Sequence, residues 1–454
     1  MNLGKNILLV SANAYTNPYP VYPLGISYLH TYLKKHLPGY NITLFDFNRQ
    51  SMSDFSGILS KGDIDIVGVS LRNIDDTNIY KKNSFIDWYR QIIETARNAG
   101  TAKVIIGGPG FSIFPDILFK ILKPDFGITG EGEETLRKLI LCIDNGMDYN
   151  QIEGLVFRTP SGEIKLNSRT EYLKSLELSF DKNLAEYYWS KSGMLNIQTK
   201  RGCPYNCIYC SYPIIDGKKV RTLDPRLIVD TIKELYFEKG ITYLFFTDSI
   251  FNISRDYNIE LAEEIIRSDV KVSWGAYFSP DNLTYEELSL FKKSGLTHIE
   301  FGTESFSDRQ LNNYGKRFTF DDVLKTSEMS SDLGIFFAHF LILGGYGETD
   351  LTLDQTFENS KRLPRSVYFP YIGMRIYPHT RLYDIAVAEG VITVSDNLLE
   401  PVYYISKQFN PDNVKERALA TGKKWIFPDF DDHGMMEKFR SRNIRGPLWE
   451  FLRF

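Results

Sequence analysis

The sequence contains few cysteines, no long apolar run and little net charge. Only four of its 454 residues are cysteine, and three of these, Cys203, Cys207 and Cys210, lie close together. This pattern indicates a metal or cluster site and disfavours a disulfide framework. No segment reaches the roughly 18 uncharged apolar residues of a membrane span, and the N-terminus lacks the apolar core and cleavage site of a signal peptide. We therefore expect a cytoplasmic protein with no transmembrane segment.

The net charge of −4 gives the chain no broad positive field, so nucleic acid is not an expected partner. With 43% hydrophobic and 24% charged residues, the composition is that of an ordinary globular protein. The length exceeds what a single hydrophobic core fills, and two or three domains are expected. An aromatic content of 14% suits apolar binding surfaces, although large cores would also account for it.

Residues 1–150 alternate short apolar strands with helical stretches. This alternation predicts the α/β class, with a parallel, doubly wound sheet. Ligands of such sheets bind at the carboxyl ends of the strands, where glycine lets the backbone approach a large cofactor closely. The residues at the predicted strand ends are Ser70, Leu71 and Arg72, then Gly107, Gly108 and Gly110, and then Gly130, Glu131, Gly132 and Glu133.

The second half of the chain repeats the alternation after a break. Residues 151–190 contain a hairpin pattern around residues 160–162 and a polar stretch, which we interpret as a connector. Residues 191–390 contain six strand–helix units. A complete barrel of eight units usually needs roughly 250 residues, so these units predict a partial (βα)6 barrel. Residues 391–454 are left as a C-terminal extension.

The cysteine loop carries the clearest chemical signal. Its spacing, Cys203-x3-Cys207-x2-Cys210, puts three thiolates directly after a predicted strand. Iron–sulfur clusters are normally held by four thiolates, so three ligands leave one iron of a [4Fe–4S] cluster open to an exogenous ligand. The alternative is a zinc site, but structural zinc usually has four Cys or His ligands and no histidine lies near this loop. Cys142 falls in a helical stretch, where cysteine is most often a small buried hydrophobe.

The cysteine loop and the motifs after it resemble radical S-adenosylmethionine (SAM) enzymes, in which SAM ligates the open iron. Tyr209 stands before the third cysteine, the aromatic position that lies beside the adenine in that family. Residues 247–249 resemble the segment that binds the SAM amino group, and residues 302–305 resemble the family's G-x-E-S. Read alone, Tyr209 would fit simple packing and residues 247–249 a helix N-cap.

Two later motifs continue the resemblance. Residues 343–349 resemble a glycine motif whose backbone meets the adenine, and residues 377–380 resemble a P-G-T element in which His379 replaces the usual glycine. The resemblance implies a SAM site made of Tyr209, Asp248, Ser249, Glu304, Leu343, Gly344, Gly345 and Tyr377.

A doubly wound sheet ahead of such a barrel resembles the cobalamin (B12)-binding radical SAM enzymes, whose first domain is flavodoxin-like. Tyr22, Leu24 and Gly25 resemble that domain, as do the strand-end residues named above, and together they are the implied cobalamin site. The Asp-x-His-x-x-Gly motif that gives some cobalamin proteins a histidine ligand is absent. We therefore expect base-off cobalamin with no histidine on cobalt and the loop of Arg72 facing its lower side. A scaffold domain without cofactor is the alternative.

The resemblance implies a 5′-deoxyadenosyl radical formed from SAM and, with methylcobalamin, methylation of an unactivated carbon. Ring formation or rearrangement without methyl transfer is the alternative reaction, and a non-catalytic cobalamin or redox sensor is the alternative class. The cysteine count leaves no ligands for a second all-cysteine cluster, so methylthiotransferases fit poorly. No catalytic residue is assigned from the sequence.

The whole chain is similar to a subgroup of these enzymes associated with lipid biosynthesis. That similarity implies a small-molecule substrate such as a lipid or isoprenoid, while a peptide or a polyketide remains open. It also implies an external electron donor such as flavodoxin or ferredoxin.

Overall fold

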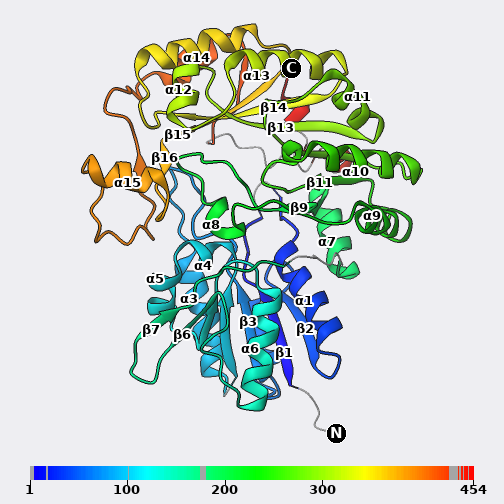
Figure 1. Ribbon diagram of the computed structural model, residues 1–454, viewed down its shortest axis with the longest axis vertical. Helices are drawn as coiled ribbons and strands as arrows, with labels where there is room; N and C mark the ends of the chain where they lie inside the picture. Colours follow the sequence, from blue (N-terminus) through cyan, green and yellow to red (C-terminus); the bar gives the residue numbers. More distant parts are fainter. Residues whose placement is uncertain are drawn as a thin grey trace.

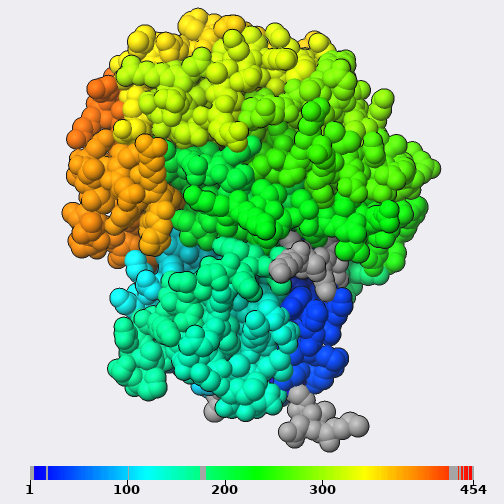
Figure 2. Space-filling view, viewed as in Figure 1, coloured from blue at the N-terminus to red at the C-terminus, as the bar shows by residue number. Residues whose placement is uncertain are grey.

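The computed structural model describes residues 5–16, 19–100, 102–173, 180–428, 438, 441–442, 444–447 and 449–453. Figure 1 shows two lobes, one built on a sheet from the first part of the chain and the other on a curved sheet from the second part. The space-filling view shows the two lobes in contact along a broad seam (Figure 2). Among the described residues, no helix has both the length and the apolar character needed to cross a membrane.

The first sheet has the strand order of a flavodoxin-like fold. Its parallel strands are β1 (Asn6–Ser11), β2 (Asn41–Asp46), β3 (Ile66–Ser70), β4 (Lys103–Gly107) and β5 (Phe126–Ile128), in the order β2-β1-β3-β4-β5. All residues of β1 after the first are buried, as expected for a parallel strand with helices on both faces of its sheet. The predicted doubly wound α/β class is confirmed.

The predicted hairpin belongs to this first sheet. Strand β6 (Leu155–Arg158) pairs antiparallel with β5, and β7 (Ile164–Leu166) pairs antiparallel with β6. The sheet therefore continues beyond residue 150, where the strand–helix alternation ends. The chain passes through α6 between β5 and β6, whereas β7 follows β6 after a short turn, as an antiparallel pair allows.

The second sheet contains all six predicted strands and a further one. The predicted strands are β8 (Leu195–Ile197), β11 (Tyr243–Phe246), β12 (Ser273–Phe278), β13 (Leu296–Glu304), β14 (Phe336–Leu343) and β15 (Val367–Ile372), all parallel and in this order. Strand β18 (Lys424–Trp425), from the C-terminal extension, pairs parallel with β15. No pairing among the described residues joins β18 to β8, so the barrel is open and partial.

Helices cover both sheets, and Figure 1 shows α9 to α14 around the outer side of the second. The first domain contains α1 (Leu24–His36), α2 (Met52–Leu59), α3 (Ile86–Asn98), α4 (Pro109–Ile113), α5 (Pro115–Leu122) and α6 (Glu133–Asn145). The rest of the chain contains α7 (Lys182–Ser192), α8 (Tyr212–Asp216), α9 (Pro225–Lys239), η1 (Phe251–Ile253), α10 (Arg255–Arg267), α11 (Tyr285–Lys293), α12 (Asp308–Asn313), α13 (Phe320–Asp332), α14 (Asp350–Arg362), α15 (Arg381–Ala388), α16 (Val414–Ala420) and η2 (Trp449–Arg453).

Local sequence signals start several of these helices. At α13, the Thr319 hydroxyl accepts from the Asp322 N–H, and the Asp322 carboxylate accepts from the Thr319 N–H, which is a capping box. Behind the second sheet, Phe251, Trp274 and Phe291 pack as a buried aromatic group between strands and helices. The opposite, inner face of that sheet points toward the first domain.

Buried ion pairs join the two domains. Arg201 lies in β9 (Lys200–Arg201), which pairs with β10 (Arg221–Thr222), and its guanidinium contacts Glu131 at 3.2 Å and Glu133 at 2.7 Å. Arg375 lies in β16 (Met374–Arg375), which pairs with β17 (Tyr403–Tyr404), and its Nε lies 3.0 Å from Asp75. The side chains of Arg375 and Asp75 are 4% and 0% exposed, so this contact is shielded from solvent.

Replacement of Asp75 tests this seam. Asp75→Asn leaves the Arg375 guanidinium buried opposite a neutral amide, and we expect the free energy of unfolding to fall by about 3–5 kcal/mol. The measurement is anaerobic chemical denaturation followed by circular dichroism. The control is Asp87→Asn, because Asp87 is 90% exposed and pairs with Arg90 on the surface of α3; a change within about 0.5 kcal/mol is expected there. Equal losses in the two variants would contradict the assignment.

Candidate active site

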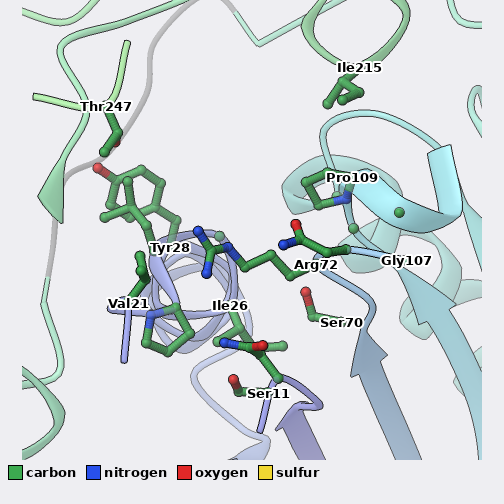
Figure 3. Close-up of a pocket in the computed structure, with 18 of the residues that line it drawn as sticks. Ser11, Val21, Ile26, Tyr28, Ser70, Arg72, Gly107, Pro109, Ile215 and Thr247 are labelled. Atoms are coloured by element: carbon green, nitrogen blue, oxygen red, sulfur yellow. The ribbon is translucent and has the colours of Figure 1, made fainter. Parts of the chain in front are cut away.

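A cavity of about 910 Å³ lies between the carboxyl ends of the two sheets. Figure 3 shows Ser11 and Ser70 at the strand ends of the first domain and Thr247 on the opposite side. All residues of the predicted cobalamin site line this cavity except Leu71, which is fully buried. The lining residues are Tyr22, Leu24, Gly25, Ser70, Arg72, Gly107, Gly108, Gly110, Gly130, Glu131, Gly132 and Glu133.

Two of the predicted glycines, Gly108 and Gly110, are required by the packing of the loops themselves. Gly108 has a φ of +95°, and a Cβ there would lie 2.8 Å from the Leu71 carbonyl oxygen. A Cβ on Gly110 would lie 3.1 Å from the same oxygen, which accepts a 2.9 Å hydrogen bond from the Gly110 N–H. The glycines therefore let the loop after β4 lie against the loop after β3, and together these loops form the cavity floor.

Arg72 extends into the middle of the cavity (Figure 3). Burial lowers the pKa of its guanidinium. Among the described residues, no carboxylate pairs with Arg72 and no hydrogen bond is made by its side chain. Arg72 is half-buried, and a cation partly removed from water without a partner is costly, so the geometry favours a ligand group at this position.

Glu131 and Glu133, by contrast, are already engaged. Glu131 accepts hydrogen bonds from Arg201 and Arg221, and Glu133 accepts from Arg201. Coulombic attraction and hydrogen bonding to Arg201 outweigh burial and lower the pKa of Glu133. Although both carboxylates line the cavity, their first role in the structure is to hold the two domains together.

A second cavity of about 230 Å³ contains the cysteine loop. It is lined by Cys203, Cys207 and Cys210 together with Tyr209, Ser249 and Glu304, three residues of the predicted SAM site. Tyr212 and Tyr277 line both cavities and therefore stand between them. The structure thus brings the predicted cluster loop and the predicted cobalamin site to neighbouring spaces.

Backbone contacts shape the cysteine loop. Gly202 has a φ of +90°, and a Cβ there would lie 2.1 Å from the Lys219 carbonyl oxygen, so no other residue fits before Cys203. The Cys203 N–H donates to the Gly217 carbonyl at 3.0 Å, and the Ile208 N–H donates to the Tyr314 carbonyl at 3.1 Å. The loop is thereby fixed from both sides.

The donor set fits a cluster with one open iron. Structural zinc usually takes four Cys or His ligands, and no histidine is among the described residues that line this cavity, so three thiols suit a cluster better than zinc. Burial raises the pKa of the Cys210 thiol to about 12, which opposes ionisation in the protein alone. Iron ligation would supply the positive charge that keeps such a thiol deprotonated.

Glu304 lies at the centre of a polar network beside the cysteines. The Tyr209 hydroxyl donates to its Oε1 at 2.6 Å, and Lys316 Nζ lies 3.3 Å from the same oxygen. Glu304 also has a φ of +68°, an uncommon conformation for a residue with a side chain and one found at functional sites. Lys316 lines the cavity and was missed by the sequence reasoning, because a lone lysine outside any motif gives no signal.

Asp248 is not brought to either cavity. Its carboxylate is fully buried, pairs with Lys200 Nζ at 2.7 Å and accepts from the Thr199 N–H at 2.7 Å. The SAM amino group was the expected partner of Asp248, but a lysine from the preceding segment occupies that role in the structure. Its neighbours diverge, since Thr247 lines the larger cavity and Ser249 the smaller one.

The remaining predicted SAM residues lie behind or beside the cysteine cavity. Leu343 is fully buried in β14, and Cβ atoms on Gly344 and Gly345 would collide with Phe409 and Tyr314. Tyr377 lines the larger cavity. His379 has a φ of +62°, so the loop keeps the left-handed conformation that the usual glycine favours. Thr380 then caps α15.

Comparison with known families identifies both halves of the chain. Residues 11–140 match the B12 binding domain, and residues 197–359 match the Radical SAM superfamily. The first range contains the glycine loops that line the larger cavity, and the second contains the three cysteines of the smaller cavity. The chain belongs to the proteins that join a B12-binding domain to a radical SAM domain.

Several curated relatives have the same overall length or are longer. An uncharacterised methyltransferase of Pyrococcus horikoshii is 24% identical over 94% of this chain and 93% of the relative. An anaerobic magnesium-protoporphyrin IX monomethyl ester cyclase of Rubrivivax gelatinosus is 26% identical over 75% of this chain and 62% of the relative. The hopanoid C-3 methylase of Methylococcus capsulatus is 24% identical over 70% of this chain and 60% of the relative. The chain therefore spans less than two thirds of the last two proteins.

The radical S-adenosylmethionine methyltransferase TsrM from Kitasatospora setae has a similar fold. Its structure with cobalamin and a [4Fe-4S] cluster bound superposes with a TM-score of 0.87 at 21% identity, over 99% of this chain and 97% of TsrM. This likeness establishes the two-domain fold of the chain. The lipid-associated subgroup is not distinguished by these matches and stays a prediction.

Iron content tests the cysteine assignment. Each of Cys203→Ala, Cys207→Ala and Cys210→Ala should reduce iron in anaerobically reconstituted protein from about four atoms per chain to near zero. Cys142→Ala is the control, because Cys142 lies on α6 in the first domain. Iron and sulfide analysis with the visible spectrum gives the readout. Loss of iron in the Cys142 variant would show that the ligand set is wrong.

The two acidic residues of the predicted SAM site should behave differently. Glu304→Gln removes a charge beside the cysteines and should weaken SAM binding about 10-fold or more, measured by equilibrium dialysis. Asp248→Asn leaves Lys200 buried without its counter-charge and should instead lower stability by about 3–5 kcal/mol. A reversed pattern, with stability lost at Glu304 and SAM affinity lost at Asp248, would restore the interpretation from the sequence.

Proposed function

We propose that this protein is a cobalamin-dependent radical SAM enzyme that methylates an unactivated carbon of a small molecule. The observation that carries the proposal is the meeting of the two cavities at Tyr212 and Tyr277. A substrate beside these tyrosines would be within reach of both the cysteine loop and the strand ends of the B12-binding domain. Similarity to proteins named as methyltransferases supports methyl transfer as the outcome.

Each cofactor has residues that suit it. Cys203, Cys207 and Cys210 would hold a [4Fe–4S] cluster, with Tyr209, Ser249 and Glu304 around bound SAM. The larger cavity would hold cobalamin over the glycine loops. Gly25 borders open space there, since a Cβ at this position would have no neighbouring atom within 4 Å. When bound, these groups supply a 5′-deoxyadenosyl radical for hydrogen abstraction and a methyl group on cobalt for transfer.

The protein's own residues would orient the substrate and exclude water. Arg72 would face the lower side of cobalamin, because it reaches into the cavity from the loop after β3 and has no protein partner among the described residues. Tyr212 and Tyr277 would separate the two cofactor spaces and leave room for one substrate between them. The ion pairs of Arg201 would keep the two cavities in register.

Base-off cobalamin without a histidine ligand is part of the proposal. Of the described residues that line the larger cavity, none is a histidine. His30 is buried, and its Nε2 lies 3.2 Å from the Ile42 carbonyl oxygen, while the His36 ring packs against Tyr32 with ring centroids 4.2 Å apart. Both lie on α1, away from the strand ends. A weakly ligated cobalt would favour transfer of its methyl group.

Ring formation is the second candidate reaction, since one relative is named as a cyclase. A lipid or isoprenoid substrate is favoured within the proposal by the apolar and aromatic cavity wall and by similarity to a hopanoid methylase. An external reductant such as flavodoxin or ferredoxin would complete turnover.

Labelled SAM tests the function. Reduced, reconstituted protein given SAM with a trideuterated methyl group should form 5′-deoxyadenosine and transfer the label to cobalamin and then to carbon in a lipid extract, followed by mass spectrometry. The Cys203→Ala variant should form neither product. Label on oxygen, nitrogen or sulfur would contradict carbon methylation, and 5′-deoxyadenosine with an unlabelled cyclised product would favour ring formation.

A spectroscopic measurement tests the cobalt ligation. Electron paramagnetic resonance of the Co(II) form should show no superhyperfine splitting from nitrogen. Nitrogen splitting would refute the base-off state, and failure of the purified protein to bind cobalamin would refute the mechanism.

A further inference from the structure

Glu300 is a buried carboxyl group that none of the recognised motifs includes. It lies in β13 and is only 8% exposed, yet its side chain lines the larger cavity. Ile299 and Phe301 pack into the core, and because side chains alternate along a strand, Glu300 between them points to the inner face of the barrel. Glu300 therefore faces the space that a substrate would use.

The carboxyl group of Glu300 has one protein partner. Trp449 Nε1 donates to its Oε1 at 3.0 Å, and among the described residues no other hydrogen bond or ion pair involves Glu300. Burial raises the pKa of Glu300 to about 7. Buried carboxyl groups normally satisfy both oxygens, so an oxygen left over beside a cavity points to a ligand.

The cavity wall around Glu300 is aromatic. Neighbouring strands align Tyr277 with Glu300 and Asn196 with Phe245, and the rings of Phe245 and Tyr277 pack edge to face with centroids 5.0 Å apart. Tyr277 is 40% exposed, so its ring is open to the cavity. It also lines the cysteine cavity, which puts a molecule bound at Glu300 next to the SAM side.

The basic residues that line the larger cavity lie elsewhere. Arg72 reaches the middle of the cavity from the loop after β3, and Arg201 is paired with Glu131 and Glu133; neither forms an ion pair with Glu300. An anionic group bound directly at Glu300 would meet a carboxyl group, whereas Arg72, unpaired among the described residues, is the position in this cavity that suits an anion. A hydroxyl, N–H or ammonium group would instead donate to the free oxygen.

We propose that Glu300 binds the substrate, and that the substrate is an apolar molecule bearing a hydrogen-bond donor, not a carboxylate or phosphate, at this end. Trp449 is a positioning residue, because it fixes Oε1 and leaves the other oxygen toward the cavity. The inference rests on the proposed function and specifies the substrate class of that same cavity.

Three naphthalene probes test the proposal on anaerobic protein reconstituted with cluster, SAM and cobalamin. 2-Naphthol has a donor, naphthalene has none, and 2-naphthoate is an anion of similar shape. Equilibrium dialysis should give a Kd for 2-naphthol about 10-fold or more below that for naphthalene, with 2-naphthoate weakest. Equal affinities for 2-naphthol and naphthalene, or a preference for 2-naphthoate, would overturn the proposal.

Variants separate a ligand contact from a structural role. At a pH well above the raised pKa of Glu300, Glu300→Gln should reduce the preference for 2-naphthol over naphthalene to a few-fold and strengthen 2-naphthoate binding, because the repelling charge of the ionised carboxylate is removed. Glu300→Leu should abolish the preference and leave naphthalene affinity unchanged, which a merely disrupted fold would not do. Trp449→Phe, which keeps an aromatic ring but no donor, should lower the preference without reversing it. Glu358→Gln, on the exposed side of α14, is the matched control and should change none of these values.

The wild-type protein distinguishes failure of the inference from failure of the proposed function. Cobalamin content and 5′-deoxyadenosine formation are measured on the same samples. If both are normal and the probes bind equally, only the substrate assignment falls. If cobalamin is not bound or SAM is not cleaved, the proposed function falls with it.

Discussion

The guanidinium of Arg201 connects the two halves of the molecule. It sits two residues before Cys203, at the start of the cysteine loop, and pairs with Glu131 and Glu133 from the strand ends of the first domain. All three side chains are buried, so the charges are stabilised by one another because water does not reach them. The position of the cysteines relative to the B12-binding sheet therefore depends on this cation, supported by Arg221 at Glu131 and by the Arg375–Asp75 pair.

The cavity follows from the way two parallel sheets meet. Each sheet collects loops at the carboxyl ends of its strands, and in this chain the two sets of loops face each other. Neither domain alone encloses the space, which has strand-end loops of the first domain on one side and β8 to β13 on the other. Two chemically different walls result, one rich in glycine with Arg72, and one aromatic with Glu300.

Much of the fold was predictable because its signals are local. Alternating apolar strands and helices gave the doubly wound sheet and all six barrel strands, and the spacing of three cysteines indicated the cluster loop. The hairpin of β6 and β7 was predicted, but its place in the first sheet and the short strand β18 were not, because each is defined by the sheet edge it joins. His379 shows the same limit, since its left-handed backbone is fixed by the loop and not by residue type.

The sequence by itself determined which residues could ligate iron and which loops end the strands, because spacing along the chain sets those properties. The tertiary structure alone decided how the carboxylates are used. Asp248 faces Lys200, Glu131 and Glu133 face arginines, Glu304 faces the cysteine cavity and Glu300 the larger one. A carboxylate takes its role from the charge and burial around it, and those come from segments distant in the sequence, as Trp449 lies 149 residues from Glu300.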